Sequence, residues 1–141
     1  MDDIEIIKEK LISYISIMNK WETENYTELQ SKKGDIAHFK QTFVNAKIEL
    51  DNIYKDYLTQ KDRKQTSSHR SLGDPPQYDP DIESIVNCKK ISNSRIEIET
   101  FKNELSGYKN QYVFLKKNGE WRLDNKKTFW THKNKWESVP I

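Results

Sequence analysis

The residues that could do chemistry in this sequence are scattered, and their spacing matches no catalytic or metal-binding motif. The metal-ligating types are three histidines and one cysteine, at His38, His69, His132 and Cys88. They lie in unrelated sequence contexts and lack the spacing of a zinc site. The chain also has no glycine-rich phosphate loop, no nucleophile elbow and no helix with two metal-binding histidines. We therefore predict no metal site, no cofactor and no catalytic residue.

Glu97 and Glu99 are the carboxylates whose spacing would best suit a general acid and base. They lie two residues apart in a segment where Ile96 and Ile98 alternate with charged residues. Side chains two positions apart share one face of a strand. The pair could therefore act together, but the same spacing is far more often the solvent-facing side of a strand. Asp124 follows the same logic, although it could also line a cavity.

Length and composition predict a single domain over residues 1–141. The net charge is +2, and its 24 basic and 22 acidic residues are spread along the chain, so no segment indicates nucleic-acid binding. No apolar run approaches the ~18 residues of a membrane span. The acidic start has neither the basic flank nor the apolar stretch of a signal peptide. With a single cysteine, we expect a cytoplasmic protein without a disulfide.

Residues 112–124 predict a tight β-hairpin around the dipeptide Asn118-Gly119. This dipeptide favours a two-residue type I′ turn, because both central residues need a positive φ. The expected cross-strand pairs are Lys117–Glu120, Lys116–Trp121, Phe114–Leu123 and Tyr112–Asn125. One face then carries Tyr112, Phe114, Trp121 and Leu123, and a partly wetted face carries Val113, Leu115, Arg122 and Asp124. A lone hairpin is marginal in water, so further strands and a helix must cover its aromatic face.

Two long amphipathic helices are predicted before any strand. The first covers residues 2 to about 21, with apolar side chains at helical spacing, namely Ile4, Ile7, Leu11, Tyr14, Met18 and Trp21. Asp2 and Glu5 have the spacing of a capping box. Residues 22–29 either prolong this helix or form a short second one, which Gly34 ends. The next helix starts with Asp35 as its N-cap and has a stripe of Ile36, Phe39, Phe43, Ala46, Leu50, Ile53 and Tyr57.

A long loop at about residues 60–81 separates the helices from the strands. It has no periodicity, and prolines follow Asp74 and Asp79, which disfavours helix at the residue before each proline. A loop of this length is unusual in a compact domain unless it is functional or mobile. We consider it a candidate recognition loop, with a disordered crossover to the sheet as an equal alternative.

Strands are expected at about residues 83–91 and 95–102, followed by the hairpin. The segment 95–102 has the alternation of an antiparallel strand with one dry side. The resulting order of two helices, a loop and about four antiparallel strands predicts an α+β fold with the helices on one face of the sheet. The tail 128–141 either adds a last strand or packs over an edge of the sheet.

Several stretches together resemble the nuclear transport factor 2 fold immunity proteins of bacterial polymorphic toxin systems. The two most specific are Met18-Asn19-Lys20-Trp21-Glu22, at the end of the first helix, and Pro76-Gln77-Tyr78-Asp79-Pro80, before the sheet. Glu99-Thr100 and the hairpin 112–124 agree with the same family, and the resemblance extends from about residue 2 to Glu137. It implies a cone-like curved antiparallel sheet wrapped around the helices. It also implies a protein without catalysis that binds and neutralises a toxin made by the same cell or its kin.

The expected partner is a cognate toxin domain, encoded by the adjacent upstream gene. Tight interfaces usually combine a few buried aromatic or arginine anchors with a complementary charged rim. Candidate partner-binding residues lie in the loop and on the wet face of the sheet: Arg70, Asp74, Tyr78, Asp79, Asp81, Glu83, Glu97, Glu99 and Arg122. If the toxin is a nuclease, its basic cleft would favour the acidic cluster of Asp74, Asp79, Asp81 and Glu83.

Two other functions are compatible with the same fold. A small-molecule-binding protein, or an isomerase- or dehydratase-like enzyme, would need a carboxylate or histidine projecting into an apolar cavity, with its pKa raised by burial. The inward positions expected from the sequence are instead aromatic or aliphatic. A homodimer through the open sheet face is compatible with either role, with Val113 and Leu115 in its seam.

Overall fold

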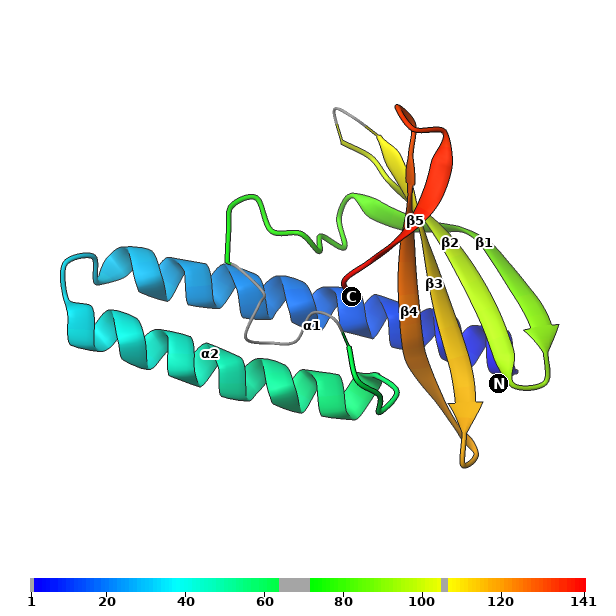
Figure 1. Ribbon diagram of the computed structural model, residues 1–141, viewed down its shortest axis with the longest axis horizontal. Coiled ribbons are helices and arrows are strands. Elements are labelled where there is room, and N and C mark those ends of the chain that lie inside the picture. Colours follow the sequence, from blue (N-terminus) through cyan, green and yellow to red (C-terminus); the bar gives the residue numbers. More distant parts are fainter. Residues whose placement is uncertain (1, 64–71, 105–106) are drawn as a thin grey trace.

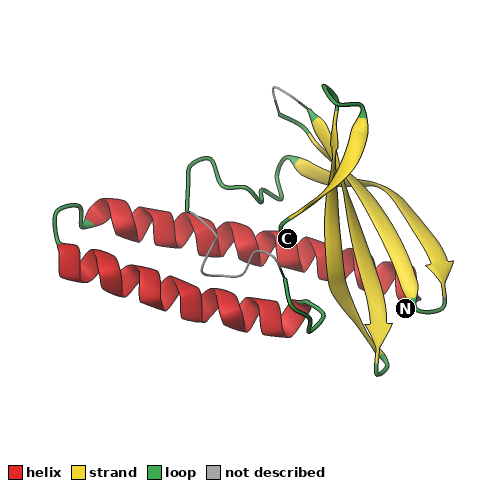
Figure 2. Cartoon of the chain, viewed as in Figure 1, coloured by secondary structure: helices red, strands yellow, loops and turns green. Residues whose placement is uncertain are grey.

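The structure is a computed structural model that describes residues 2–63, 72–104 and 107–141. Two helices, α1 (Asp3–Ser31) and α2 (Ile36–Tyr57), form a helical hairpin that precedes the sheet (Figure 1). The strands are β1 (Glu83–Ser92), β2 (Arg95–Lys102), β3 (Tyr108–Lys117), β4 (Glu120–Trp130) and β5 (Lys135–Val139). They pair antiparallel in the order β1-β2-β3-β4-β5, which gives the α+β fold expected from the sequence (Figure 2).

Helix α1 is one continuous helix and not two. Its N-cap Asp2 accepts a hydrogen bond from the backbone N–H of Glu5 at 2.9 Å, so the predicted cap is confirmed. Gly34, with a φ of 96°, lies in the turn that follows the helix, where a residue with a β-carbon would be strained. Asp35 then caps α2 by accepting from the backbone N–H of His38.

The predicted β-hairpin is confirmed near its turn and differs beyond it. Asn118 and Gly119 have φ values of 51° and 77°, as a type I′ turn requires. The register then shifts between Val113 and Phe114, which pair with Asn125 and Leu123. Asp124 is therefore the extra residue of a β-bulge. As a consequence, Tyr112 pairs with Lys126, and the expected pair with Asn125 is wrong.

The C-terminal tail adds a fifth strand, which is one of the two alternatives that the sequence left open. Strand β5 pairs with β4 over five residue pairs, from Lys126–Val139 to Trp130–Lys135. Asn134, in the turn before it, has a φ of 52°, a left-handed conformation that asparagine adopts more readily than most residues. The tail thus forms an edge strand of the sheet.

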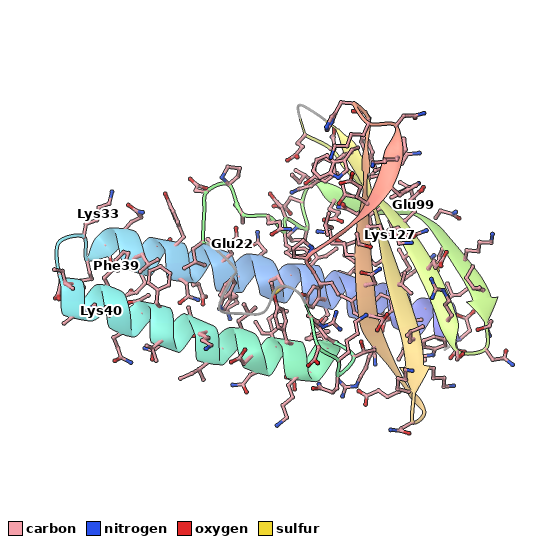
Figure 3. All side chains as sticks on the ribbon, in the orientation of Figure 1. Glu22, Lys33, Phe39, Lys40, Glu99 and Lys127 are labelled. Atoms are coloured by element: carbon pink, nitrogen blue, oxygen red, sulfur yellow. The ribbon has the colours of Figure 1, made fainter. Side chains whose placement is uncertain are left out.

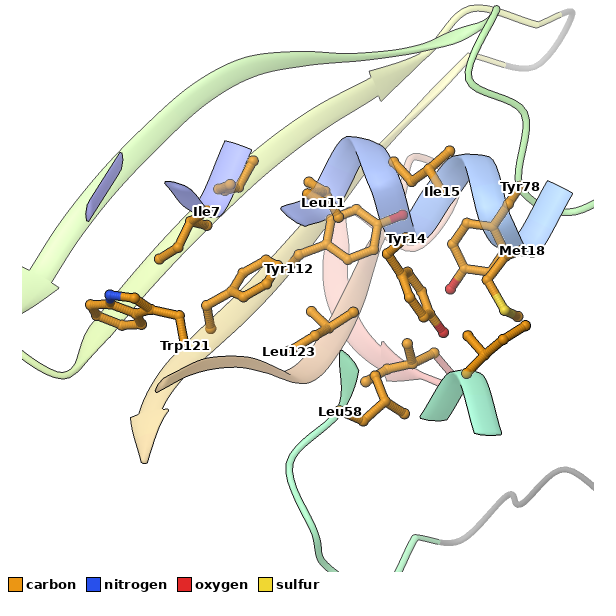
Figure 4. Close-up of a cluster of buried hydrophobic side chains, with 14 of the residues drawn as sticks. Ile7, Leu11, Tyr14, Ile15, Met18, Leu58, Tyr78, Tyr112, Trp121 and Leu123 are labelled. Carbon is orange, nitrogen blue, oxygen red and sulfur yellow. The ribbon is translucent and has the colours of Figure 1, made fainter. Parts of the chain in front are cut away.

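The core lies between α1 and the inner face of the sheet, which we define as the face toward the helices. It joins side chains of both helices to side chains of β2, β3 and β4: Ile7, Leu11, Tyr14, Met18, Leu50, Ile53, Ile96, Ile98, Tyr112, Phe114, Trp121 and Leu123. Figure 4 shows α1 side chains packed against Tyr112, Trp121 and Leu123. Each large apolar side chain buried there contributes about 1.5–3 kcal/mol.

The apolar stripe predicted for α2 is buried only in its second half. Ala46, Leu50 and Ile53 are buried, but Ile36 and Phe39 are 71% and 41% exposed. The physical reason is that the helical hairpin extends beyond the sheet, so α1 alone covers this end of α2 (Figure 1). We call this end, residues 33–44, the hairpin tip.

Candidate partner-binding surfaces

The acidic residues of the loop before β1 lie at the surface. Asp74 and Asp81 are exposed, and Asp79 is half-buried. The Asp79 side chain accepts from the backbone N–H of Asp81, and its carbonyl accepts from Ile82 and Glu83, so Asp79 shapes the turn that leads into β1. Arg70, a further predicted contact, lies outside the described residues.

Tyr78 lies in the core and not at the surface, which corrects its prediction as a partner-binding residue. Its side chain is fully buried, and its carbonyl accepts a hydrogen bond from Asn19 at 2.7 Å. The Lys126 ammonium lies 4.4 Å from the centre of its ring, in cation–π geometry. The neighbouring backbone N–H of Gln77 donates to Glu22 at 2.8 Å, so two contacts attach this loop to α1.

Glu83 is also buried, so the structure assigns it to the interior and not to a partner contact. One oxygen of its carboxylate accepts from the hydroxyls of Thr100 at 2.6 Å and Tyr112 at 2.7 Å, and from the side-chain amide of Asn110 at 3.1 Å. Thr128 donates in turn to the Asn110 carbonyl oxygen at 2.8 Å. Burial, together with the nearby Tyr78 and Glu83, raises the pKa of Tyr112 well above its usual value. We call the hydrogen-bonded set of Glu83, Thr100, Asn110, Tyr112 and Thr128 the interior polar cluster.

Buried polar side chains correct the expectation that all inward positions are aromatic or aliphatic. Thr100, Asn110, Lys126 and Thr128 alternate with outward residues on three strands, and all four are buried. A carboxylate inside such a sheet is what the enzyme alternative would require. Here, however, Glu83 accepts three hydrogen bonds from protein donors, which is the arrangement of a structural cluster that fixes β1 to β2 and β3.

Arg122 stabilises the end of α2. Its guanidinium donates to the carbonyls of Lys55 at 2.8 Å and Leu58 at 3.1 Å, and it lies 3.3 Å from the Glu120 carboxylate. The last carbonyls of a helix have no partner within the helix. The side chain proposed as a partner contact is therefore occupied in joining α2 to β4.

Asp124, the bulged residue of β4, holds the segment that follows α2. Its carboxylate accepts from the Thr59 hydroxyl at 2.6 Å and forms an ion pair with Lys61 at 3.2 Å, while its carbonyl accepts from Arg63. Burial by itself would raise the pKa of Asp124. The contacts with Thr59, Lys61 and Arg63 outweigh it, so the pKa lies below the usual value.

Replacing Asp124 by Asn should make the free energy of unfolding less dependent on pH in the acidic range. Because the folded pKa of Asp124 is lowered, its contribution is present above about pH 4 and is lost as the pH falls through the folded pKa. Asp124→Asn should cost about 1–2 kcal/mol of unfolding free energy at pH 7, and less at pH 3. Urea unfolding at both pH values checks this. Equal costs at the two values would show that the carboxylate is not stabilised by its partners.

Glu97 and Glu99 lie on the outer face of the sheet, as predicted. Cross-strand partners share a face, and the row that contains Glu99 continues through Gln111 and Lys127 to Ser138. Glu97 forms a two-point ion pair with Arg95, with contacts of 3.0 and 2.8 Å. Val113, on the same face, is only 1% exposed, so the homodimer seam expected there has little apolar surface to offer.

The outer face also carries a row of three aromatic side chains, with Lys109 between two of them, which was not predicted from the sequence. Phe101 pairs with Lys109, Lys109 with Phe129 and Phe129 with Trp136, so the four side chains form one line across β2 to β5. Phe101 and Trp136 are 36% and 38% exposed. We call this line the aromatic row. The tail contains Phe129 and Trp136 but has no strand periodicity, so only the register of β5 with β4 shows that the two side chains lie side by side.

Of the three histidines, His69 lies outside the described residues, so the structure places His38 and His132. Among the described residues there is no group of three or more His, Cys, Asp or Glu side chains that could hold a metal ion. His38 lies 2.7 Å from the Glu28 carboxylate, across the hairpin from α2 to α1. Over the same part of the chain, neither helix has an apolar stretch sufficient to cross a bilayer.

A family model and a curated relative agree on what this chain is similar to. The model described as NTF2 fold immunity protein matches residues 6–139. The chain belongs to this family. A relative named Immunity protein RhsIA, from Dickeya dadantii (strain 3937), is 31% identical over 137 residues, which is 96% of each chain. No solved structure matches the chain. These two matches confirm the family that was predicted from the motifs of α1 and the loop.

Proposed function

We propose that this NTF2 fold immunity protein binds a cognate bacterial toxin and neutralises it by forming a tight protein–protein complex. The observation that carries the proposal is the family match over residues 6–139, together with a relative of nearly equal length whose name is that of an immunity protein. The proposed partner is a toxin domain encoded by the adjacent upstream gene, and the proposed compartment is the cytoplasm. The protein acts by occupancy, without catalysis and without a cofactor.

Neutralisation by occupancy makes a strong demand on affinity. To leave almost no toxin free, the complex needs a dissociation constant of about 1 nM or less, equivalent to about −12 kcal/mol. Such affinity comes from a small number of well-packed anchors on a preorganised surface. The outer face of the sheet suits this requirement, because both helices lie on the opposite face (Figure 1). Glu97 and Glu99 are proposed as part of its charged surround.

Co-expression tests the proposal. The C-terminal domain of the protein encoded upstream should be toxic when expressed alone, and this chain should restore growth and co-purify with it. A mutant toxin without activity should still co-purify, because occupancy does not depend on the toxin's chemistry. Restored growth without any complex would contradict binding as the mechanism.

Charge reversal in the acidic loop should slow toxin association. Asp74 and Asp81 are exposed, so Asp74→Lys/Asp81→Lys changes the surface charge without removing the turn contacts of Asp79. If the toxin has a basic surface, the association rate should fall by about 10-fold at low salt, and by less at high salt. Stopped-flow mixing measures this rate, with Asp56→Lys on α2 as the control. An unchanged rate and affinity would exclude the loop from the interface.

A further inference from the structure

The aromatic row is the part of the outer face with the properties of a binding anchor. Phe101 and Trp136 are each more than one-third exposed, and the rings of Phe129 and Trp136 lie 5.4 Å apart in a tilted contact. Neighbouring strands are ~4.8 Å apart, so the row spans about 15 Å. Tryptophan is enriched among the residues that dominate interface energies, and phenylalanine is enriched in interfaces in general.

Charged side chains of opposite sign flank the aromatic row on one side. The next row along the sheet contains Glu99 on β2 and Lys127 on β4, with Gln111 between them. Figure 3 shows both charged side chains on the sheet. Within the described residues, no ion pair involves either of them. Strand β3 lies between Glu99 and Lys127, so the two charges do not pair with each other. Each can therefore interact with a charged group of a partner.

The aromatic row is held in place before any partner arrives. Its members pair through continuous antiparallel ladders from β2 to β5. At the β4–β5 turn, Lys133 and Lys135 lie 3.2 and 3.4 Å from the Glu137 carboxylate, which ties the turn to the edge strand. A surface that is already ordered loses little conformational entropy on binding.

We propose that the aromatic row anchors the toxin in the neutralised complex. The matching surface of the toxin has apolar groups that cover Phe101, Phe129 and Trp136, while the ammonium of the exposed Lys109, between Phe101 and Phe129, stays in water. A cationic side chain of the toxin faces Glu99, and a carboxylate faces Lys127. This assignment rests on the proposed function, and it names the surface and the partner chemistry that the function leaves open.

The hairpin tip is the competing exposed apolar surface. It includes Ile36, Phe39, Phe43 and Val44, each more than 40% exposed, in a shallow groove beside Lys33 and Lys40. Figure 3 places Lys33, Phe39 and Lys40 at the end of the helices that lies far from the sheet. Residues 33–44 contain no tryptophan or tyrosine, and the charged side chains that line the groove are Lys33, Asp35 and Lys40. Because the Asp35 carboxylate caps α2, the charge that the groove offers a partner is mainly positive, whereas the row offers a tryptophan anchor beside charges of both signs.

Matched substitutions on the two surfaces test this assignment against the co-purified toxin domain. Trp136→Thr and Phe101→Thr remove aromatic anchors but keep residues suited to a strand. Each should weaken toxin binding by about 30-fold or more, chiefly through faster dissociation. Phe43→Ala, at the tip, removes a Phe of similar exposure and should leave affinity within about threefold. Lys127→Glu should weaken binding about 10-fold, whereas Lys40→Glu at the tip should not.

The outcomes separate this assignment from the proposed function. Circular dichroism and thermal unfolding establish that each variant is folded. If the wild-type chain binds the toxin domain and the row variants bind it with the same affinity, the assignment is overturned and the immunity function stands. Loss of binding in Phe43→Ala but not in Trp136→Thr would overturn it in favour of the tip. If the wild-type chain does not bind the toxin domain, both the function and the assignment fail.

Discussion

Trp121→Ala should lower the free energy of unfolding by about 3–5 kcal/mol, the usual cost of truncating a large buried aromatic side chain. Trp121 is 4% exposed and belongs to the cluster that joins α1 to the sheet (Figure 4). Its carbonyl accepts from the Lys10 ammonium at 2.7 Å, so the same residue is tied to α1 through the backbone. A loss of this size is a large part of the stability of an ordinary domain. Urea unfolding followed by circular dichroism measures it.

Trp136→Thr is the matched control for Trp121→Ala. Trp136 is 38% exposed on the opposite face of the sheet, so its replacement should cost less than about 1 kcal/mol. Comparing the unfolding free energies of the two variants thus distinguishes a tryptophan packed in the core from one exposed on the outer face. A cost below 1 kcal/mol for Trp121→Ala would mean that the core does not depend on this end of the sheet.

Glu83→Ala should cost about 3 kcal/mol, because it removes the acceptor shared by three buried donors. The hydroxyls of Thr100 and Tyr112 and the amide of Asn110 all bond to one Glu83 oxygen. A buried donor left without a partner costs about 1–3 kcal/mol. Some of this cost is recovered if water enters the space that the side chain leaves. Thermal and urea unfolding of the variant measure the effect.

Two milder variants show whether the cost comes from the hydrogen bonds. Glu83→Gln keeps the size of the side chain and one carbonyl acceptor, so it should cost less than Glu83→Ala. Tyr112→Phe removes only the 2.7 Å hydrogen bond and should cost about 1 kcal/mol. Equal losses for Glu83→Gln and Glu83→Ala would indicate that charge, and not the number of accepted bonds, matters at this position. No loss in any of the three would remove the structural role of the interior polar cluster.

The parts of the fold that local chemistry determines were predictable from the sequence. The caps at Asp2 and Asp35 depend on a side chain within three residues of the backbone N–H that it accepts from. The turn at Asn118-Gly119 depends on two residues that tolerate a positive φ. The alternation of Ile96 and Ile98 with charged residues determined which face of β2 is buried. Each of these signals is contained in a few consecutive residues.

The rest depends on tertiary pairing, which a single sequence does not show. The bulge at Asp124 is visible only in the register of β3 with β4. Glu83 was expected at the surface because it belongs to an acidic cluster in the sequence, but its hydrogen-bond partners lie 17 to 29 residues away in β2 and β3. Phe39 follows a helical apolar stripe, yet it is exposed because the helices extend beyond the sheet.

The same distinction applies to the partner-binding residues. Charge and loop composition selected Glu99, Asp74 and Asp81, and the structure places all three where a partner can reach them. Composition could not indicate Trp136, because its irregular tail gave no strand pattern. Only the pairing of β5 with β4 brings it beside Phe129. The contact assignments themselves remain predictions for the experiments described above.

Titration calorimetry of the purified chain with the purified C-terminal domain of the protein encoded upstream tests the central claim most directly. We predict a one-to-one complex with a dissociation constant of about 1 nM or tighter. We also predict that the same domain, held in that complex, loses its toxic activity. No measurable heat, and no co-elution of the two proteins at about 10 µM each, would contradict neutralisation by tight binding.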